Sequence, residues 1–233
     1  MLQSLKSDLR KLATPKKAKA SEWFFKTGPG QYGEGDQFIG VTVPEQRSVA
    51  RKYKDLPLSE TEQLLKSSIH EERLVALIIL VERFRKSEQE AQKEIYDFYL
   101  ANTNRVNNWD LVDLSAEYIV GGYLADKPKD TLYKLARSKS LWERRIAMIA
   151  TYYYIKQGKA KYTLEIAEIL LYDSHDLIQK AVGWMLREVG KRCSEQVLTD
   201  FLDKHATTIP RTTLRYAIER FPEEKRQKYL KAK

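Results

Sequence analysis

His70-Glu71-Glu72-Arg73-Leu74-Val75-Ala76 is the first of three similar stretches on which the fold prediction depends. The others are Leu141-Trp142-Glu143-Arg144-Arg145-Ile146-Ala147 and His175-Asp176-Leu177-Ile178-Gln179-Lys180-Ala181. Each joins polar residues to an alanine within an apolar stripe of helical period. The second and third alanines lie 34 residues apart, and the first and second lie 71 apart, about two such periods. A helix-pair repeat of this length predicts a helical solenoid, although an ordinary helical bundle remains the alternative.

Helical periodicity also extends outward from these stretches over almost the whole chain, and alternating strand patterns are nearly absent. Pro44 and Pro210 stand where helices are expected to begin, and Gly158 and Gly190 stand near expected helix ends. Ser59, with Glu62 three residues later, predicts a capping box. The expected helices are 2–13, 17–26, 44–53, 58–67, 70–86, 88–102, 109–124, 129–137, 141–156, 161–171, 175–191, 194–205, 209–219 and 222–231. Because no low-complexity linker divides the chain, we expect a single domain over 1–233.

The composition favours a polyanion as partner. The 233 residues carry a formal net charge of +9 and a pI of about 9.4, and 42% of them are hydrophobic. Such a basic excess indicates DNA, RNA or acidic lipid without distinguishing among them. Cys193 is the one cysteine, and the sequence has neither a run of ~20 apolar residues nor an apolar secretory signal. We therefore expect a soluble intracellular protein in a reducing compartment.

Four glycines between Thr27 and Asp36 exclude a helix there. A phosphate-binding loop is one interpretation, but no Gly-Lys-Ser/Thr follows. An ordered turn with tight backbone packing is favoured. Metal binding is not expected, because the three histidines are isolated and Cys193 has no partner at ligand spacing. His70 and His175 are expected to be solvated or to cap helices.

Trp109-Asp110-Leu111-Val112-Asp113 is the strongest candidate site. Residues four apart on a helix lie on one face, so the indole of Trp109 and the carboxylate of Asp113 would be neighbours. An aromatic wall beside an anion suits a cationic intermediate. The alternative is that the acids complement the helix dipole, and Asp110 is expected to do only that.

A row of cations surrounds a second tryptophan. Lys180, Trp184, Arg187 and Lys191 recur along the edge of the apolar stripe of the 175–191 helix. Arg145 similarly flanks the stripe of the 141–156 helix. Such rows indicate binding of something flat and anionic, although a tryptophan at the core edge with snorkelling cations is equally consistent.

At these residues the chain resembles the AlkD-type DNA alkylation repair glycosylases, which are built of HEAT-like helical repeats. Residues 109–113 match the motif W-D-x-V-D, and 141–147 match W-x-x-R-x-A. Residues 178–188 match I-Q-K-A-h-G-W-h-L-R-E, where h is apolar, and 38–47 match F-h-G-h-x-x-P-x-x-R. The resemblance spans roughly residues 20–220. It implies an all-α fold, a right-handed-type helical solenoid of HEAT-like helix pairs with a concave basic DNA-binding face.

The resemblance also implies roles for individual residues. Asp113 corresponds to the catalytic acid, and Arg145 to an arginine beside the lesion strand. Trp109 and Trp184 correspond to an aromatic clamp. Phe24 stands at the position of a tyrosine of the family, so the hydroxyl of that tyrosine is missing here. Val43 replaces a threonine of the family, which puts one backbone hydrogen bond in question. The expected DNA-binding residues are Phe24, Arg47, Lys180, Arg187 and Lys191.

The implied activity is hydrolysis of the N-glycosidic bond of cationic N3- or N7-alkylated purines in duplex DNA, without base flipping. The expected partner is double-stranded DNA that contains alkylated bases, bound by a monomer without cofactor, metal or membrane. The implied location is the bacterial cytoplasm, in association with the nucleoid when DNA is bound. Two other classes stay open. One is a non-catalytic binder of damaged or branched DNA on the same scaffold, and the other is a protein-binding helical adaptor.

Overall fold

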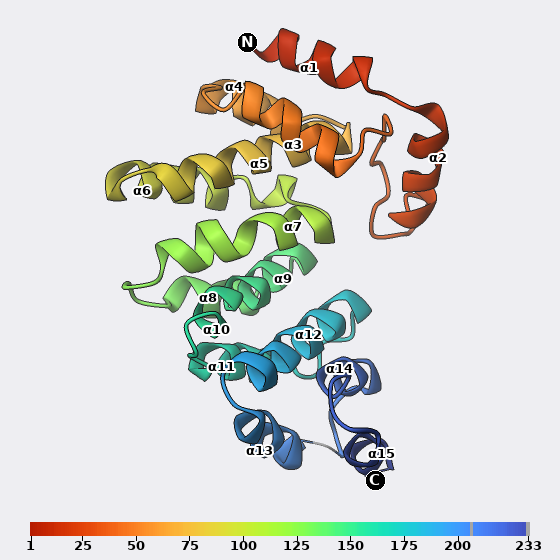
Figure 1. Cartoon of the computed structure of the whole chain (residues 1–233), viewed down its shortest axis with the longest axis vertical. Coiled ribbons are helices and arrows are strands. Elements are labelled where there is room, and N and C mark those ends of the chain that lie inside the picture. Colours follow the sequence, from red (N-terminus) through yellow and green to blue (C-terminus); the bar gives the residue numbers. More distant parts are fainter. Residues whose placement is uncertain (206, 232–233) are drawn as a thin grey trace. The chain divides into compact units, whose positions relative to one another are not determined.

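The computed structural model describes residues 1–205 and 207–231, and it is all-α (Figure 1). Within the described residues the β-structure is an isolated parallel bridge between Gln37 and Ile69. The α-helices are α1 Leu2–Lys11, α2 Pro15–Phe24, α3 Val43–Lys52, α4 Leu58–Leu65, α5 His70–Lys86, α6 Gln89–Ala101, α7 Trp109–Ala116, α8 Asp130–Ala136, α9 Leu141–Ala150, α10 Tyr152–Ile155, α11 Lys161–Leu170, α12 Asp176–Arg192, α13 Glu195–His205, α14 Arg211–Ala217 and α15 Glu223–Lys231. A 3-10 turn, Thr103–Arg105, and a π-helical turn, Glu117–Gly121, complete the helical elements.

The chain divides into two compact units. The first unit is Met1–Ser115, and the second is Ala116–Lys233. In the first unit, α1 packs on α3 and α4, both of which pack on α5, and α5 packs on α6. In the second unit, α8 and α9 pack together, α12 contacts α9, α11, α13 and α14, and α15 packs on α14.

Helix α5 forms the centre of the first unit. Its apolar residues from Leu74 to Val81 are all buried, so this helix is covered on every side. Its first four residues, His70 to Arg73, are polar or charged and yet also buried. A buried charge is tolerated where it has a partner, and this turn therefore organises the segments around it.

The partners of this turn come from distant parts of the first unit. Glu72 forms a salt bridge with Lys6 of α1, with 2.8 Å between Oε2 and Nζ. The carboxylate of Glu71 accepts hydrogen bonds from the backbone N–H groups of Ile39, Gly40 and Val41, at 2.7–3.3 Å. Glu71 thus fixes the segment that leads into α3.

Gly40 lets the same segment lie directly against α2. Its φ of +79° is a left-handed conformation that favours glycine. A Cβ at this position would lie 2.2 Å from the carbonyl oxygen of Thr14 and 2.5 Å from the amide nitrogen of Ala18. The amide of Thr14 also donates to the carbonyl of Ile39 at 2.9 Å, so the start of α2 is held by backbone contacts.

Two glycines permit close helix packing in the second unit. A Cβ at Gly183 of α12 would lie 2.5 Å from the carbonyl oxygen of Thr213 in α14. A Cβ at Gly121, in the π-helical turn, would lie 2.2 Å from the carbonyl oxygen of Ala150 in α9. At both positions the glycine backbone therefore packs directly against the neighbouring helix. These contacts fix how α12 lies on α14 and how the π-helical turn lies on α9.

Each expected helix has a counterpart among the described residues in the same order, with ends shifted by a few residues. The three similar stretches lie at the starts of α5, α9 and α12, and their alanines, Ala76, Ala147 and Ala181, are fully buried. Two expected helices are interrupted. The helix expected at 109–124 changes to a π-helical turn at Glu117, and the helix expected at 141–156 is broken between α9 and α10 at Thr151.

The predicted capping box at Ser59 is wrong. Helix α4 already begins at Leu58, directly after Pro57, so Ser59 lies inside the helix. A capping interaction occurs instead at the start of α3, where the amide N–H and the hydroxyl of Thr42 both donate to Oε2 of Glu45.

Among the described residues, no helix is both long and apolar enough to cross a membrane.

Candidate functional site

Helix α7 carries the candidate acid and the first tryptophan. Trp109 is the first residue of this helix, and Asp113 follows one turn later. Both side chains are half-buried. The side chain of Asn108 accepts a hydrogen bond from the amide of Trp109 at 2.8 Å, which fixes the start of the helix. The sequence motif therefore produces the predicted geometry, with an indole and a carboxylate on successive turns of one helix.

An aromatic wall holds the indole of Trp109. The ring of Phe25 stacks on it with centroids 5.2 Å apart, and the ring of Phe24 meets it edge-on at 5.8 Å. The indole N–H donates to the hydroxyl of Tyr32 at 3.3 Å. Phe24, which the resemblance implies as a DNA-binding residue, thus touches Trp109, while its own side chain is 55% exposed. Stacked and edge-on arrangements of this kind each stabilise the contact and define the ring orientation.

The wall continues into the core through Phe38 and His70. Phe38 stacks on Phe25 with centroids 5.1 Å apart and on the ring of His70 at 4.6 Å. His70 is 2% exposed. The prediction that His70 is solvated or caps a helix is therefore wrong, because this ring is a buried part of the wall behind Trp109.

Carboxylates face both ring nitrogens of His70. Its Nδ1 lies 3.0 Å from Oδ2 of Asp36, and its Nε2 lies 2.8 Å from Oδ2 of Asp110. Arg73 pairs with the other oxygen of Asp36 at 2.6 Å, and the side chain of Asn108 donates to Asp36 at 3.3 Å. Asp110 therefore links α7 to α5, which is more than the dipole role expected of it.

This arrangement keeps His70 protonated. Burial lowers the pKa of His70, but the charge of Asp110 and the hydrogen bonds to Asp110 and Asp36 outweigh burial and raise the pKa to about 9. Burial raises the pKa of Asp36, but the hydrogen bond from His70 and the charge of Arg73 exceed that effect and lower it. At neutral pH the cluster thus contains two carboxylates, one guanidinium and one imidazolium, and its charges balance.

The glycine-rich segment supplies two of the residues around Trp109. It is an ordered turn without helix, and a Cβ at Gly33 would lie 2.4 Å from the carbonyl oxygen of Phe25. The favoured prediction of tight backbone packing is therefore confirmed. Tyr32 and Asp36 extend from this turn toward Trp109 and His70, respectively.

The carboxylate of Asp113 lies near a buried hydroxyl. Tyr99 of α6 is fully buried, and its hydroxyl lies 3.0 Å from Oγ of Ser115, whose own hydroxyl donates to the carbonyl of Leu111. Burial raises the pKa of Tyr99 well above its usual range, the bond to Ser115 opposes this effect, and the charge of Asp113 adds to it. The neutral phenol thus remains hydrogen-bonded to Ser115 of α7.

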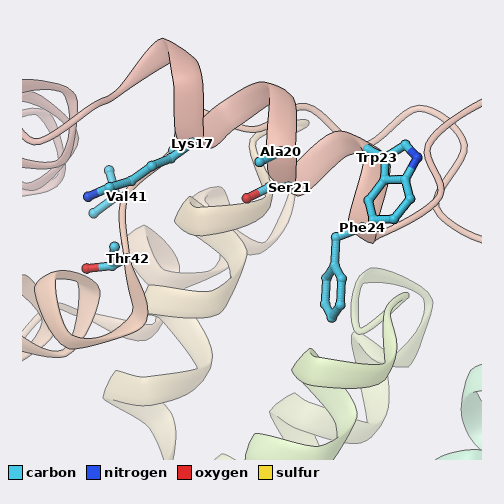
Figure 2. Close-up of a pocket in the computed structure, with 8 residues that line it drawn as sticks. Lys17, Ala20, Ser21, Trp23, Phe24, Val41 and Thr42 are labelled. Atoms are coloured by element: carbon cyan, nitrogen blue, oxygen red, sulfur yellow. The ribbon is translucent and has the colours of Figure 1, made fainter.

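A cleft of about 480 Å³ lies beside the aromatic wall, at α2. Its lining residues are Lys17, Ala20, Ser21, Trp23, Phe24, Gly40, Val41 and Thr42. Figure 2 shows Phe24 extending from the end of α2 toward a neighbouring helix drawn in green, and Trp23 at the same end of α2. A second cleft, of about 730 Å³, is also lined by Trp23 and Phe24.

In the second unit, Arg145 of α9 is a buried side chain. It is 5% exposed, and its Nη1 donates to the carbonyl oxygen of Leu177 at 2.6 Å. This bond joins α9 to the first turn of α12. Sequence reasoning expected a residue beside the lesion strand, and the structure adds a role in holding two helices together.

Helix α12 carries the row that surrounds the second tryptophan. Trp184 is half-buried and lies against Tyr152 with ring centroids 6.2 Å apart. Lys180 pairs with Asp176 at 2.8 Å, and Arg187 pairs with Glu219, whereas Lys191 is exposed beside a small cleft that Arg187 also lines. The row thus lies on one helix as predicted, with acidic partners for two of its cations. The remaining expected cation, Arg47, is exposed on α3 of the first unit.

Sequence reasoning missed Phe25, Tyr32, Asp36 and His70. These residues have no local signature, because His70 meets carboxylates that lie 34 and 40 positions away in the chain. A buried ionic cluster could be suspected only from a polar helix start inside an apolar core. In the ranges 1–205 and 207–231, no group of three or more His, Cys, Asp and Glu side chains is arranged to hold a metal ion.

Comparison with known families assigns the chain. The family model described as DNA alkylation repair enzyme matches residues 5–221, which include most of both units and all of α7 and α12. The protein belongs to this family. The resemblance read from the motifs of α7, α9 and α12 is therefore confirmed at the level of the family.

A solved structure of related fold agrees with this assignment. The chain is similar to a structure described as a predicted DNA alkylation repair enzyme from Enterococcus faecalis, with a TM-score of 0.69 and 16% sequence identity. The alignment covers 91% of this chain and 97% of that chain. No curated protein shows a significant match to the sequence. At this identity the structural similarity establishes the fold alone.

Proposed function

We propose that this protein is a DNA glycosylase that removes cationic N3- or N7-alkylated purines from duplex DNA. The family assignment supports alkylated DNA as the substrate class. The observation that carries the proposal is α7, where Asp113 follows Trp109 by one turn and the indole is held by Phe24, Phe25 and Tyr32. An oriented aromatic ring and an anion on one helix face suit a cationic sugar intermediate.

The proposed chemistry needs one carboxylate. Alkylation at N7 or N3 leaves the purine positively charged, so the base departs without a general acid, unlike the leaving group in most glycoside hydrolysis. Asp113 stabilises the oxocarbenium ion at C1′ and positions the water that attacks it. Trp109 and Trp184 contact the deoxyribose, where cation–π attraction of about 0.5–2 kcal/mol per ring favours the developing charge.

The basic residues supply affinity for the DNA backbone. Arg47, Lys180, Arg187 and Lys191 bind phosphates, and exposed ion pairs such as Lys180 with Asp176 exchange easily because they contribute little free energy. Arg145, whose Nη1 also donates to the carbonyl oxygen of Leu177, contacts the lesion-strand phosphate. In this proposal the helix pairs form a right-handed, HEAT-like solenoid whose concave face is basic, and one monomer binds the duplex without extruding the alkylated base.

The decisive experiment measures base release from a duplex that contains one N7-methylguanine. Wild type is compared with Asp113→Asn, which removes the charge at constant size, and with Asp97→Asn as the matched control. Asp97 is an exposed acid on α6 that pairs with Lys93. We expect release by wild type and by the control, and a loss of at least about a hundredfold in Asp113→Asn, the scale of removing one transition-state charge contact.

Equal release by all three proteins would refute the role of Asp113. Binding of the duplex without release by wild type would instead place the chain among non-catalytic binders of damaged DNA. Absence of binding at moderate salt would favour a protein-binding adaptor and would contradict the proposed function altogether.

A further inference from the structure

Trp23 has no role in the proposed chemistry, and it is the most exposed large aromatic residue described. Its side chain is 83% exposed, next to Phe24 at 55%. None of the residues of α2 is buried, so this helix contributes little to the core. A large exposed aromatic residue loses hydrophobic free energy while it faces water, and such a position therefore indicates a binding surface.

The structure holds Trp23 in place despite its exposure. At the start of α2, Gly40 packs against the backbone of Thr14 and Ala18. At its end, Phe25 stacks between Trp109 and Phe38, and the amide of Gly33 donates to the carbonyl of Lys26 at 3.1 Å. Both ends of the helix are thus anchored, which presents the indole of Trp23 on a defined support.

Trp23 lines both clefts, which also contain apolar residues and lysines. Ala20, Phe24 and Val41 form apolar walls of the first cleft, and Ser21 and Thr42 also line it. Lys17 lies at the rim of the first cleft, and Lys19 and Lys26 line the second. These three lysines are exposed, and the acid among the lining residues of the two clefts is Glu22.

We propose that Trp23 and Phe24 form a stacking site for an unpaired nucleobase of DNA, with Lys17, Lys19 and Lys26 holding the adjoining phosphates. Every nucleobase has a flat π-face and polar edges, and stacking on aromatic side chains inside a basic groove is the general way in which proteins bind unpaired nucleotides. The proposal rests on the proposed function, because it assumes DNA as the partner. The base bound here is distinct from the alkylated base, which stays in the duplex beside Asp113.

Charge favours this occupant over a second copy of the chain. The net charge of +9 opposes self-association through a surface that is itself basic, whereas a nucleotide supplies both the flat ring and the anion. The proposal therefore predicts a preference of the protein among DNA substrates. The protein should bind a duplex with one unpaired nucleotide more tightly than the fully paired duplex of the same sequence.

The test compares three duplexes of one sequence, namely fully paired, with one unpaired adenine, and with an abasic site in place of that adenine. Affinity is measured for wild type, Trp23→Ala, Trp23→Phe and Tyr172→Ala. Tyr172 is the control because it is another exposed aromatic residue, 66% exposed, in the second unit. In a parallel titration, 2-aminopurine replaces the unpaired adenine, and its fluorescence quenching reports stacking.

We expect Trp23→Ala to lose about tenfold in affinity for the duplex with the unpaired adenine, the usual effect of removing one stacked base contact. Affinity for the paired and abasic duplexes should change less than about twofold, and Trp23→Phe should restore most of the loss because a ring is present again. Quenching of 2-aminopurine should disappear in Trp23→Ala and persist in Tyr172→Ala.

Equal effects of Trp23→Ala on all three duplexes, or no effect on any of them, would overturn the proposal while leaving the glycosylase activity of Asp113 unaffected. A sedimentation experiment that showed a wild-type dimer abolished by Trp23→Ala, with DNA affinity unchanged, would assign the surface to self-association and overturn the proposal as well. Failure of wild type to bind any of the duplexes would refute both this inference and the proposed function.

Discussion

The indole of Trp109 and the imidazole of His70 belong to one stack of rings. Phe25 lies between the two rings, with centroids 5.2 Å from Trp109 and 5.0 Å from His70. Asp110, the neighbour of Trp109, binds Nε2 of His70. The protonated histidine thus fixes the position of α7 through a bond to the residue beside the indole, and this contact couples stability to pH.

His70 should therefore stabilise the folded protein most at low and neutral pH. Its folded pKa of about 9 lies above its ordinary value of 6.5, so the stabilisation is complete below pH 6.5 and is lost as the pH rises through 9. Urea unfolding of wild type and His70→Gln from pH 6 to pH 10 measures this effect. The difference in unfolding free energy should decrease by about 3 kcal/mol between pH 6 and pH 10.

Glutamine can form hydrogen bonds but does not titrate. The difference between the two curves of unfolding free energy against pH therefore reports His70 alone, because the lysines and tyrosines titrate in both proteins. A difference that stayed constant over this range would show that His70 is not protonated in the folded protein.

Phe24→Ala should impair activity without unfolding the protein. The ring is mostly exposed, so its loss removes little core, but its edge-on contact with Trp109 disappears. An aromatic pair contributes about 0.5–1.5 kcal/mol, which predicts a two- to tenfold decrease in base release, with a melting temperature close to that of wild type. Single-turnover release and thermal unfolding check both parts, and a large decrease in melting temperature would show that Phe24 is instead a structural residue.

At the scale of the element, α2 shows how a helix without buried residues is kept in place. The helix is held by close backbone contacts at Gly40 and Gly33. The carboxylate of Glu71 supports the first of these contacts, because it binds the backbone N–H groups from Ile39 to Val41. Contacts of this kind leave the side chains of the helix free for binding. The position of α2 therefore depends on two glycines outside it more than on its own sequence.

Gly40→Ala tests this dependence, with Gly30→Ala as the matched control. Both glycines have φ above +70°, but a Cβ at Gly40 meets backbone at 2.2 Å, whereas a Cβ at Gly30 has no neighbour within 4 Å. We expect Gly30→Ala to cost about 1 kcal/mol of stability from backbone strain, and Gly40→Ala about 3 kcal/mol or more, with rapid proteolysis within residues 15–36.

Urea unfolding and limited proteolysis give the two readouts. Equal losses in the two variants would mean that strain alone acts at both positions and that the contact of Gly40 with α2 contributes nothing.

At the scale of the whole molecule, net charge and its distribution should govern the proposed interaction with DNA. The chain carries +9 at pH 7, and the expected DNA-binding cations occur in both units, with Arg47 in the first and Lys180 and Lys191 in the second. Binding to a polyanion releases counterions, so affinity should fall steeply with salt. Residues that contact phosphates directly should contribute more to this salt dependence than residues that only add to the net charge.

A triple substitution of Arg47, Lys180 and Lys191 to glutamine separates the two contributions. The control substitutes Lys11, Lys86 and Lys93 with glutamine. These lysines are exposed and each is paired with an acid, and the control changes the net charge by the same amount. If the first set binds phosphates, the slope of log affinity against log salt should become less negative by about 2–3 in that variant and change little in the control. Equal changes in the two variants would show that these three residues have no specific role in DNA binding.

The sequence by itself determined the helices, the three buried alanines and the family motifs. These features depend on contacts within a few residues, such as the helical spacing of Trp109 and Asp113, and local spacing is directly visible in a chain. The same reasoning failed at Ser59, where Pro57 had already started the helix. It also failed for His70, which its local sequence presents as a polar residue at a helix start.

Only the tertiary structure decided which residues surround Trp109. Tyr32, 77 positions away, accepts the bond from its indole, and Asp36, Asp110 and His70 form a charged cluster behind it. Burial is what makes these polar groups seek partners, since an unpaired charge in the core is costly, and burial depends on the packing of α2, α5 and α7. The sequence shows which polar and charged side chains are present, whereas the fold determines which of them are buried together and form bonds with each other.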